Sequence, residues 1–267
     1  MGTLDVNLPI APEQPVNTSG QQRQLWQTRD LVVASVVSLT AFFGLVVALT
    51  IGLIVTSGVD PNDQEAITSQ MASLPFSIGT TLASFAALVG SVALITRWRK
   101  HDWAAIGLIP IDRGMILLAL GLAIALRVLA IPVALGLQAL GFPMDNPQIQ
   151  MLAPNGFEWG SFLAMLLMAG VLIPIGEELF FRGLLYRWMF ERWGFVVALI
   201  ASSVVFGLVH GHPTIAVLTF FLGLAAGWVY QRSGSIWASI AVHSLFNILG
   251  IVLLYAMLAS GIPMPGM

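Results

Sequence analysis

The sequence predicts an all-α protein, a polytopic membrane helix bundle of about seven transmembrane helices. Composition is the first reason, because 57% of the 267 residues are hydrophobic, 9% are charged and the mean hydropathy is +0.88. A water-soluble fold has no way to bury that much apolar surface. The second reason is that the apolar residues form runs of about twenty, the length that a helix needs to cross a bilayer. The third is that basic residues fall on alternate loops between these runs.

The apolar runs divide the chain into three parts. Residues 1–30 alternate prolines with polar residues, so we expect a disordered cytoplasmic tail there. Residues 31–141 hold the N-terminal transmembrane helices, and residues 142–260 hold the remaining helices of the same membrane domain. The expected spans are approximately Leu31 to Ser57, Leu74 to Thr96, Met115 to Leu140, Trp159 to Arg182 or beyond, Phe195 to His210, Thr214 to Tyr230, and Ser235 to Ala259.

The charges on the loops predict the orientation. Loops on one side carry Arg23, Arg29, Arg97, Arg99, Lys100, Arg113, Arg182, Arg187, Arg192 and Arg232. Loops on the other side carry Asp60, Asp63, Glu65, Asp145 and Glu158. Because cytoplasmic loops are enriched in Lys and Arg, the N-terminus is expected in the cytoplasm and the C-terminus outside. The compact chain shows no targeting segment, so the expected location is a bacterial cell membrane, with the protein integral and multi-pass.

Several classes of protein are disfavoured by what the sequence lacks. No basic run suggests nucleic acid as a partner, and no glycine-rich phosphate loop suggests a nucleotide. Cysteine is absent, which removes thiolate metal sites and cysteine nucleophiles. The chain has neither a Gly-x-Ser-x-Gly nucleophile elbow nor a His-Glu-x-x-His zinc helix. The lipid bilayer is therefore an expected partner, and the polar residues within the hydrophobic runs add a membrane-associated polypeptide to it.

Ionisable side chains inside the hydrophobic runs point to a functional site. Glu177 and Glu178 lie in the fourth run, His210 ends the fifth, and His243 and Asn247 lie in the seventh. A charged group at membrane depth costs about 2.5–3.5 kcal/mol on insertion scales, so such residues usually mark function. Residues four apart share a helix face, which predicts an ion pair between Glu178 and Arg182. The same spacing places His210 on the same face as Phe206.

Counting residues predicts that these side chains meet. If the fourth helix continues past Arg182 and the chain turns near Gly194, Glu177 and His210 lie equally far from that turn on antiparallel helices. Both would be about 25 Å from the tip of the hairpin. His243 reaches the same level only if this hairpin projects about 10 Å beyond the membrane surface.

The chemistry of this set fits peptide-bond hydrolysis by water. A desolvated glutamate can act as a general base, particularly when a histidine orients the water. A histidine with an asparagine supplies hydrogen-bond donors for the oxyanion that forms when water attacks an amide carbonyl. A covalent intermediate is not required.

Three short motifs resemble those of a known family. They are EELFFR at residues 177–182, FGLVH at 206–210 and HSLFN at 243–247, in this order on successive hydrophobic segments. Together they resemble the CAAX protease and bacteriocin-processing (CPBP) family, the Abi-type intramembrane endopeptidases. The similarity covers roughly Trp159 to Tyr255, so residues 142–260 would hold the catalytic helices.

The resemblance implies a role for each motif residue. Glu177 would activate water with His210, while His243 and Asn247 would stabilise the oxyanion. The supporting residues would be Glu178, Arg182 and Phe206. A zinc ion held by Glu177, His210 and His243 explains the same residues, but the preferred interpretation needs no cofactor.

Other interpretations remain open at this stage. The protein could act without cleavage, as a membrane scaffold or a bacteriocin-immunity protein, or as a small transporter. His212 is interpreted as a loop residue. Arg127, in the third span, could pair with a glutamate, bind a substrate carboxylate or bond to helix carbonyls near Pro132.

Overall fold

The computed structural model describes residues 24–144, 153 and 156–261, and every regular element in these ranges is helical. Within them, six helices are long and apolar enough to cross a membrane. The protein is therefore an integral, multi-pass membrane protein, and the predicted fold class is confirmed. The elements are α1 (Thr28–Ser57), α2 (Gln64–Met71), α3 (Leu74–Trp98), η1 (Trp103–Ile106), α4 (Arg113–Ala139), α6 (Trp159–Leu167), η2 (Met168–Leu172), α7 (Ile173–Phe180), η3 (Phe181–Tyr186), α8 (Arg187–Leu208), α9 (Pro213–Ser233) and α10 (Ile236–Ala259).

The difference between six helices and the predicted seven lies in one run. Residues Trp159–Leu208 form 50 residues of nearly continuous helix, which contains two of the predicted spans. Gly194 interrupts this run with φ 76° and ψ −176°, a conformation that a residue with a Cβ rarely adopts. The chain reverses at the glycine where the sequence predicts a turn.

Two π-helical turns bracket the short helix that carries the glutamates. The turn η2 precedes α7 and the turn η3 follows it, so the helix from Trp159 changes its winding twice. Pro174 lies in the first turn of α7, where a missing N–H is tolerated, because the widened turn precedes it. Each π-turn rotates the residues that follow relative to a regular α-helix, and such turns are frequent at functional sites.

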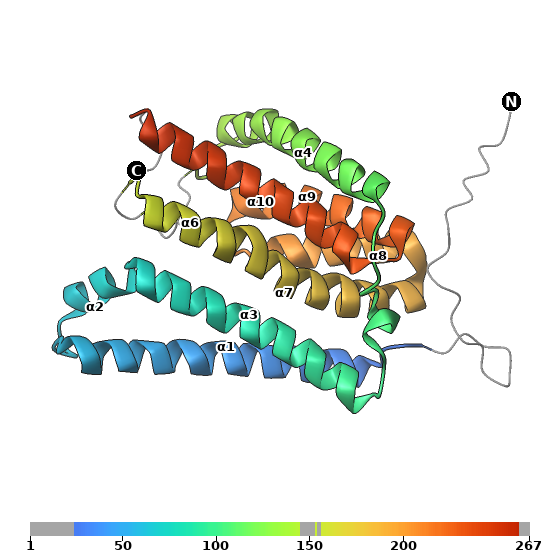
Figure 1. Cartoon of the computed structure of the whole chain (residues 1–267), viewed down its shortest axis with the longest axis horizontal. Coiled ribbons are helices and arrows are strands. Elements are labelled where there is room, and N and C mark those ends of the chain that lie inside the picture. Colours follow the sequence, from blue (N-terminus) through green and yellow to red (C-terminus); the bar gives the residue numbers. More distant parts are fainter. Residues whose placement is uncertain (1–23, 145–152, 154–155, 262–267) are drawn as a thin grey trace, which may run out of the picture.

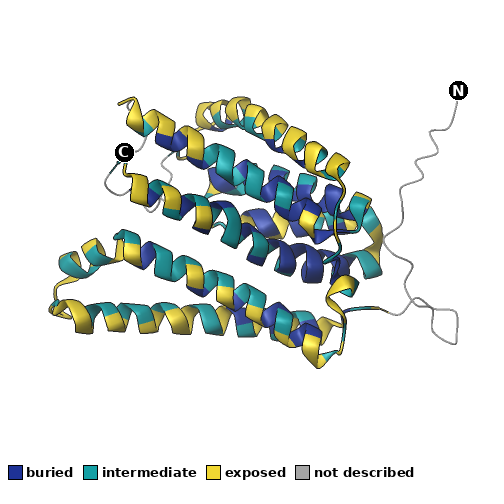
Figure 2. Ribbon diagram, viewed as in Figure 1, coloured by how far each residue is buried: buried dark blue, intermediate teal, exposed yellow. Residues whose placement is uncertain are grey.

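The helices pack as one bundle with its core at one end. Figure 1 shows α1 and α3 side by side along one edge, α10 beside α4 along the other, and α6 and α7 between them. Figure 2 shows that buried residues concentrate in α7, η3, α8, α9 and the first half of α10, whereas α1 and α4 are largely exposed. Apolar side chains such as Val55 and Leu117 cover these exposed surfaces, as expected for helices that face lipid.

The N-terminal segment packs against the core earlier than predicted. The expected tail extends to residue 30, but α1 begins at Thr28 and Trp26 is fully buried. The indole Nε1 of Trp26 donates a hydrogen bond to the carbonyl of Gly183 at 2.7 Å, and Asp30 forms an ion pair with Arg99 at 3.0 Å. The tail interpretation is thus wrong for the last few residues, while residues 1–23 lie outside the described part of the chain.

Candidate active site

A cavity of about 560 Å³ lies where the helices of the core diverge. Side chains from α3, α4, α6, α7, α9 and α10 line it, together with His210 at the end of α8. Its polar lining includes the residues that the sequence singles out, namely Glu177, His210, His243, Asn247 and Arg127. These residues from four of the predicted spans therefore line one cavity.

Glu178 is the anchoring carboxylate of the site. Its side chain is completely buried, and its Oε1 accepts a hydrogen bond from Nη1 of Arg182 at 2.9 Å, so the ion pair predicted from the four-residue spacing is present. Nη2 of Arg182 donates to the carbonyl of Gly223 at 3.1 Å, which ties this pair to α9. A buried carboxylate is stable only when charges and hydrogen bonds compensate for its lost hydration. The guanidinium of Arg182 and the imidazole of His243 supply that compensation.

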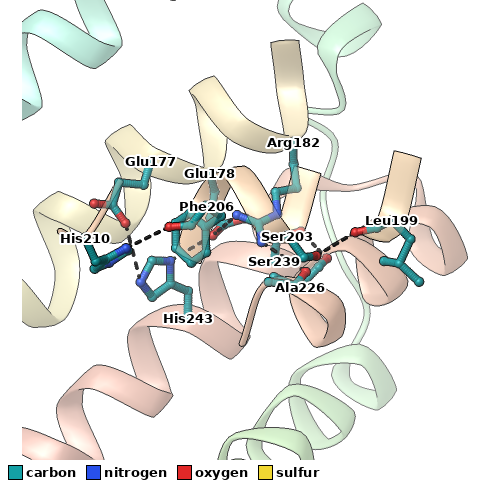
Figure 3. A network of polar contacts seen from close by, with 11 residues as sticks. Glu177, Glu178, Arg182, Leu199, Ser203, Phe206, His210, Ala226, Ser239 and His243 are labelled. Atoms are coloured by element: carbon teal, nitrogen blue, oxygen red, sulfur yellow. Dashed lines mark hydrogen bonds and ion pairs between the residues drawn. The ribbon is translucent and has the colours of Figure 1, made fainter. Parts of the chain in front are cut away.

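Glu177 differs from its neighbour because it faces the cavity. Its side chain is 18% exposed, and its Oε2 lies 3.7 Å from Nε2 of His243. Among the described residues, no donor forms a hydrogen bond with this oxygen. A buried carboxylate oxygen without a protein partner normally binds water or a ligand. Figure 3 shows the carboxylate directed toward His243, with His210 nearby.

His243 is held between the two glutamates. Its Nδ1 lies 2.8 Å from Oε1 of Glu178. Because Glu178 pairs with Arg182, its carboxylate accepts this hydrogen bond and Nδ1 carries the proton. The opposite nitrogen, Nε2, points to Glu177, as Figure 3 shows. The contact with Glu178 thus fixes the orientation of the ring.

His210 is oriented by its own helix. Its Nδ1 lies 2.8 Å from the carbonyl oxygen of Phe206. A carbonyl only accepts hydrogen bonds, so Nδ1 donates, and Nε2 of the neutral ring is an acceptor. Phe206 also packs edge-on against both imidazoles, with centroid distances of 5.1 Å to His210 and 5.5 Å to His243, and the guanidinium of Arg182 lies over its ring at 4.6 Å. This fully buried phenylalanine contacts both histidines and the arginine and so fixes the positions of their side chains.

Asn247 lies one turn after His243 on α10, and its amide bridges to the π-turn. Nδ2 donates a hydrogen bond to the carbonyl of Ala169 at 2.9 Å. A side-chain amide has two N–H groups, so one remains for a group in the cavity. The π-turn η2 thus presents the carbonyl that orients Asn247.

The metal-free interpretation stays a prediction from the sequence. In the part of the chain that the structure describes, no three His, Asp or Glu side chains are disposed to hold a metal ion. The Nδ1 atoms of both histidines are already bonded, to Glu178 and to Phe206, which leaves the Nε2 atoms and the Glu177 carboxylate as the possible ligands.

The structure also places two residues whose roles the sequence leaves open, His212 and Arg127, and three that the sequence does not single out. His212 is the N-cap residue of α9 and is not among the residues that line the cavity. Arg127 bonds to a helix carbonyl, but that of Phe246 on α10, not one near Pro132. Three small hydroxyl residues of α3 also line the cavity: Ser77, Thr80 and Thr81. Their one visible signal is a polar cluster inside an apolar span.

Comparison with protein families agrees with the motifs. Residues 159–249 match the family described as type II CAAX prenyl endopeptidase, Rce1-like. The matched segment begins at the start of α6, ends within α10, and contains all three motifs. Neither the curated proteins nor the solved structures gave a match to the chain. Residues 159–249 therefore form a domain of the Rce1-like type II CAAX prenyl endopeptidase family, in the wider CPBP group that the motifs resemble.

Proposed function

We propose that this protein is an intramembrane endopeptidase that hydrolyses a membrane-associated polypeptide, prenylated or bearing a leader, with water activated by Glu177. One observation carries the proposal. A carboxylate oxygen of α7 without a hydrogen-bond partner among the described residues, an oriented imidazole just after α8, and a second imidazole and an amide donor on α10 face the same cavity. The family domain supports the same class of reaction.

The proposed reaction begins with a water molecule between Glu177 and the histidines. Oε2 of Glu177 and Nε2 of His243 are 3.7 Å apart, so one water could donate a hydrogen bond to the carboxylate and accept one from Nε2–H of a doubly protonated His243. Nε2 of neutral His210 accepts a hydrogen bond and helps to orient this water. Glu177 removes one proton as the water oxygen attacks the carbonyl carbon of the substrate.

The attack converts the carbonyl oxygen into an oxyanion, and donors then become important. The second N–H of Asn247 can donate to the oxyanion, because only the first is bonded to the carbonyl of Ala169. His243 donates to the oxyanion when both ring nitrogens carry protons, with Nδ1–H bonded to Glu178. When the C–N bond breaks, the proton held by Glu177 passes to the leaving nitrogen, so the products are a carboxylic acid and an amine.

Burial separates the roles of the two adjacent glutamates. Glu178 is fully buried and bonded to Arg182 and His243, which suits orientation and not proton transfer to substrate. Glu177 reaches the cavity, which suits contact with water. Side chains at adjacent helix positions point about 100° apart. The carboxylate of Glu178 therefore faces the core, and that of Glu177 faces the cavity.

A cleavage assay on purified protein in lipid vesicles tests the proposal. The probe is a peptide with a prenylated cysteine followed by three residues, and mass spectrometry identifies the products. Glu177→Gln is expected to abolish cleavage, while Glu65→Gln on the exposed helix α2 serves as the matched control and should retain it. A scaffold, an immunity protein or a transporter would give no products with either variant or with the wild type. Full cleavage by Glu177→Gln would refute the role of this carboxylate.

A further inference from the structure

Arg127 is a cation in the cavity wall that the proposed reaction does not use. It lies in α4, and its Nε and Nη2 donate hydrogen bonds to the carbonyl of Phe246 at 2.9 and 2.6 Å. The guanidinium carbon also lies 3.7 Å from the centre of the Phe246 ring. Among the described residues, no carboxylate forms an ion pair with it. A cation at membrane depth that bonds only to neutral groups is costly.

The neighbouring helix leaves space for this guanidinium. Gly250 lies one turn after Phe246 on α10, and a Cβ built at this glycine would fall directly on the guanidinium group of Arg127. Any other residue there would displace the arginine. The guanidinium has five N–H donors in a planar fork, and Nη1 bonds to none of the described residues. Both N–H groups of Nη1 and the second N–H group of Nη2 are therefore available to a planar anion in the cavity.

The distance from the hydrolytic residues fits a peptide. Phe246 and Gly250 follow His243 by three and seven residues on the same helix, which corresponds to about 5–10 Å along the axis. An extended peptide advances about 3.3 Å per residue, so this distance is spanned by about two or three residues. Arg127 and Glu177 line the same cavity, so one bound peptide can reach both.

We propose that Arg127 is a specificity-determining residue that binds a carboxylate of the peptide substrate, about two or three residues from the cleaved bond. The inference rests on the proposed function, because it assumes that Glu177 marks the cleaved bond. The carboxylate has two possible sources with the same chemistry, the C-terminus of the peptide or an acidic side chain near the cleaved bond. A neutral peptide of the same shape lacks the group that compensates the charge of Arg127.

Three peptides distinguish the sources. All carry a prenylated cysteine followed by three residues. The first ends in a free carboxylate, the second is its C-terminal amide, and the third is an amide whose last residue is glutamate. We expect the wild type to cleave at least one of the two carboxylate peptides with a kcat/KM about 10- to 100-fold above that of the neutral amide, as for a charge-assisted hydrogen bond. The preferred peptide identifies the source.

Variants separate this role from a structural one. Arg127→Gln should cleave all three peptides at the rate of the neutral amide. Gly250→Ala keeps the charge but displaces the guanidinium, so it should reduce the preference as well. Gly136→Ala is the matched control, because a Cβ at that exposed position of α4 meets open space. If Arg127 served only to hold α4 against α10, Arg127→Gln would slow cleavage of all three peptides by the same factor and leave the preference intact.

The outcome can be separated from that of the proposed function. Binding of fluorescently labelled forms of the three peptides to Glu177→Gln reports the carboxylate preference without cleavage. If the wild type cleaves peptides without preferring a carboxylate, or if Arg127→Gln keeps the preference, the inference is wrong and the proposed function stands. If no peptide is cleaved but Glu177→Gln binds the carboxylate peptides more tightly and Arg127→Gln does not, Arg127 binds a carboxylate as inferred, whereas the proposed function fails and with it the position relative to a cleaved bond.

Discussion

The carboxylate of Glu178 and Nδ1 of His243 lie 2.8 Å apart, although 65 residues separate them in the sequence. This contact joins α7 to α10 and is buried on both sides. It also connects to Arg182, so that one oxygen of Glu178 accepts hydrogen bonds from both an imidazole and a guanidinium. The charge that holds the helices together is therefore the same charge that orients a histidine of the cavity.

Glu178→Gln should impair both stability and turnover. Replacing one partner of a buried ion pair leaves the other charge uncompensated, at a cost of about 3–5 kcal/mol. An amide can also donate to Nδ1, so His243 would no longer be confined to one tautomer. Thermal unfolding in detergent and kcat on the peptide assay measure the two effects. A variant with the stability and kcat of the wild type would contradict the arrangement.

Phe206→Ala should destabilise the fold more than an equivalent change on the lipid-facing surface. Phe206 is fully buried and contacts both histidines, Phe181 and Arg182. Truncation of a buried phenylalanine costs about 3–5 kcal/mol. Phe43→Ala on α1, where the side chain is 61% exposed, is the matched control and should cost about 0.5 kcal/mol or less. Equal shifts of the unfolding temperature for the two variants would disprove the role of Phe206 in packing the site.

Asn247→Ala should lower kcat more than it raises KM. Loss of one oxyanion donor typically reduces kcat by about 10²–10³-fold, because the bond forms in the transition state. The substitution also frees the carbonyl of Ala169, so the unfolding temperature is measured in parallel. Asn62→Ala, in an exposed turn, serves as the control. An increase in KM with unchanged kcat would assign Asn247 to substrate binding instead.

Removal of metal ions should leave cleavage unchanged. The proposed reaction uses the Glu177 carboxylate, two imidazoles and the Asn247 amide, and none of its steps needs a metal; among the described residues no group of three His, Cys, Asp or Glu side chains could hold one. Dialysis against a chelator, followed by elemental analysis and the peptide assay, measures this directly. Loss of activity that added Zn²⁺ restores would contradict the metal-free mechanism.

The sequence could predict the helices and the ion pair of Glu178 because both depend on local patterns. The spans follow from runs of apolar residues, and the pair of Glu178 with Arg182 follows from their spacing within one helix. The turn at Gly194 follows from the length that one span requires. These predictions involve residues that are close in the sequence.

Contacts between helices could not be predicted in the same way. In a soluble protein the apolar face of a helix shows which side is buried, but a membrane helix is apolar toward both lipid and core. The sequence therefore does not show that Arg127 bonds to Phe246, or that Trp26 reaches Gly183. The π-turns also depend on tertiary packing, since no residue type in Met168–Leu172 requires one.

The central claim is that Glu177 activates the attacking water, and single-turnover kinetics tests it most directly. The measurement compares the rate of bond cleavage and the affinity for the peptide between the wild type and Glu177→Gln. We expect the cleavage rate to fall by at least about 10²–10⁴-fold, the usual contribution of a general base, while the affinity stays within about twofold. A cleavage rate equal to that of the wild type would contradict the account.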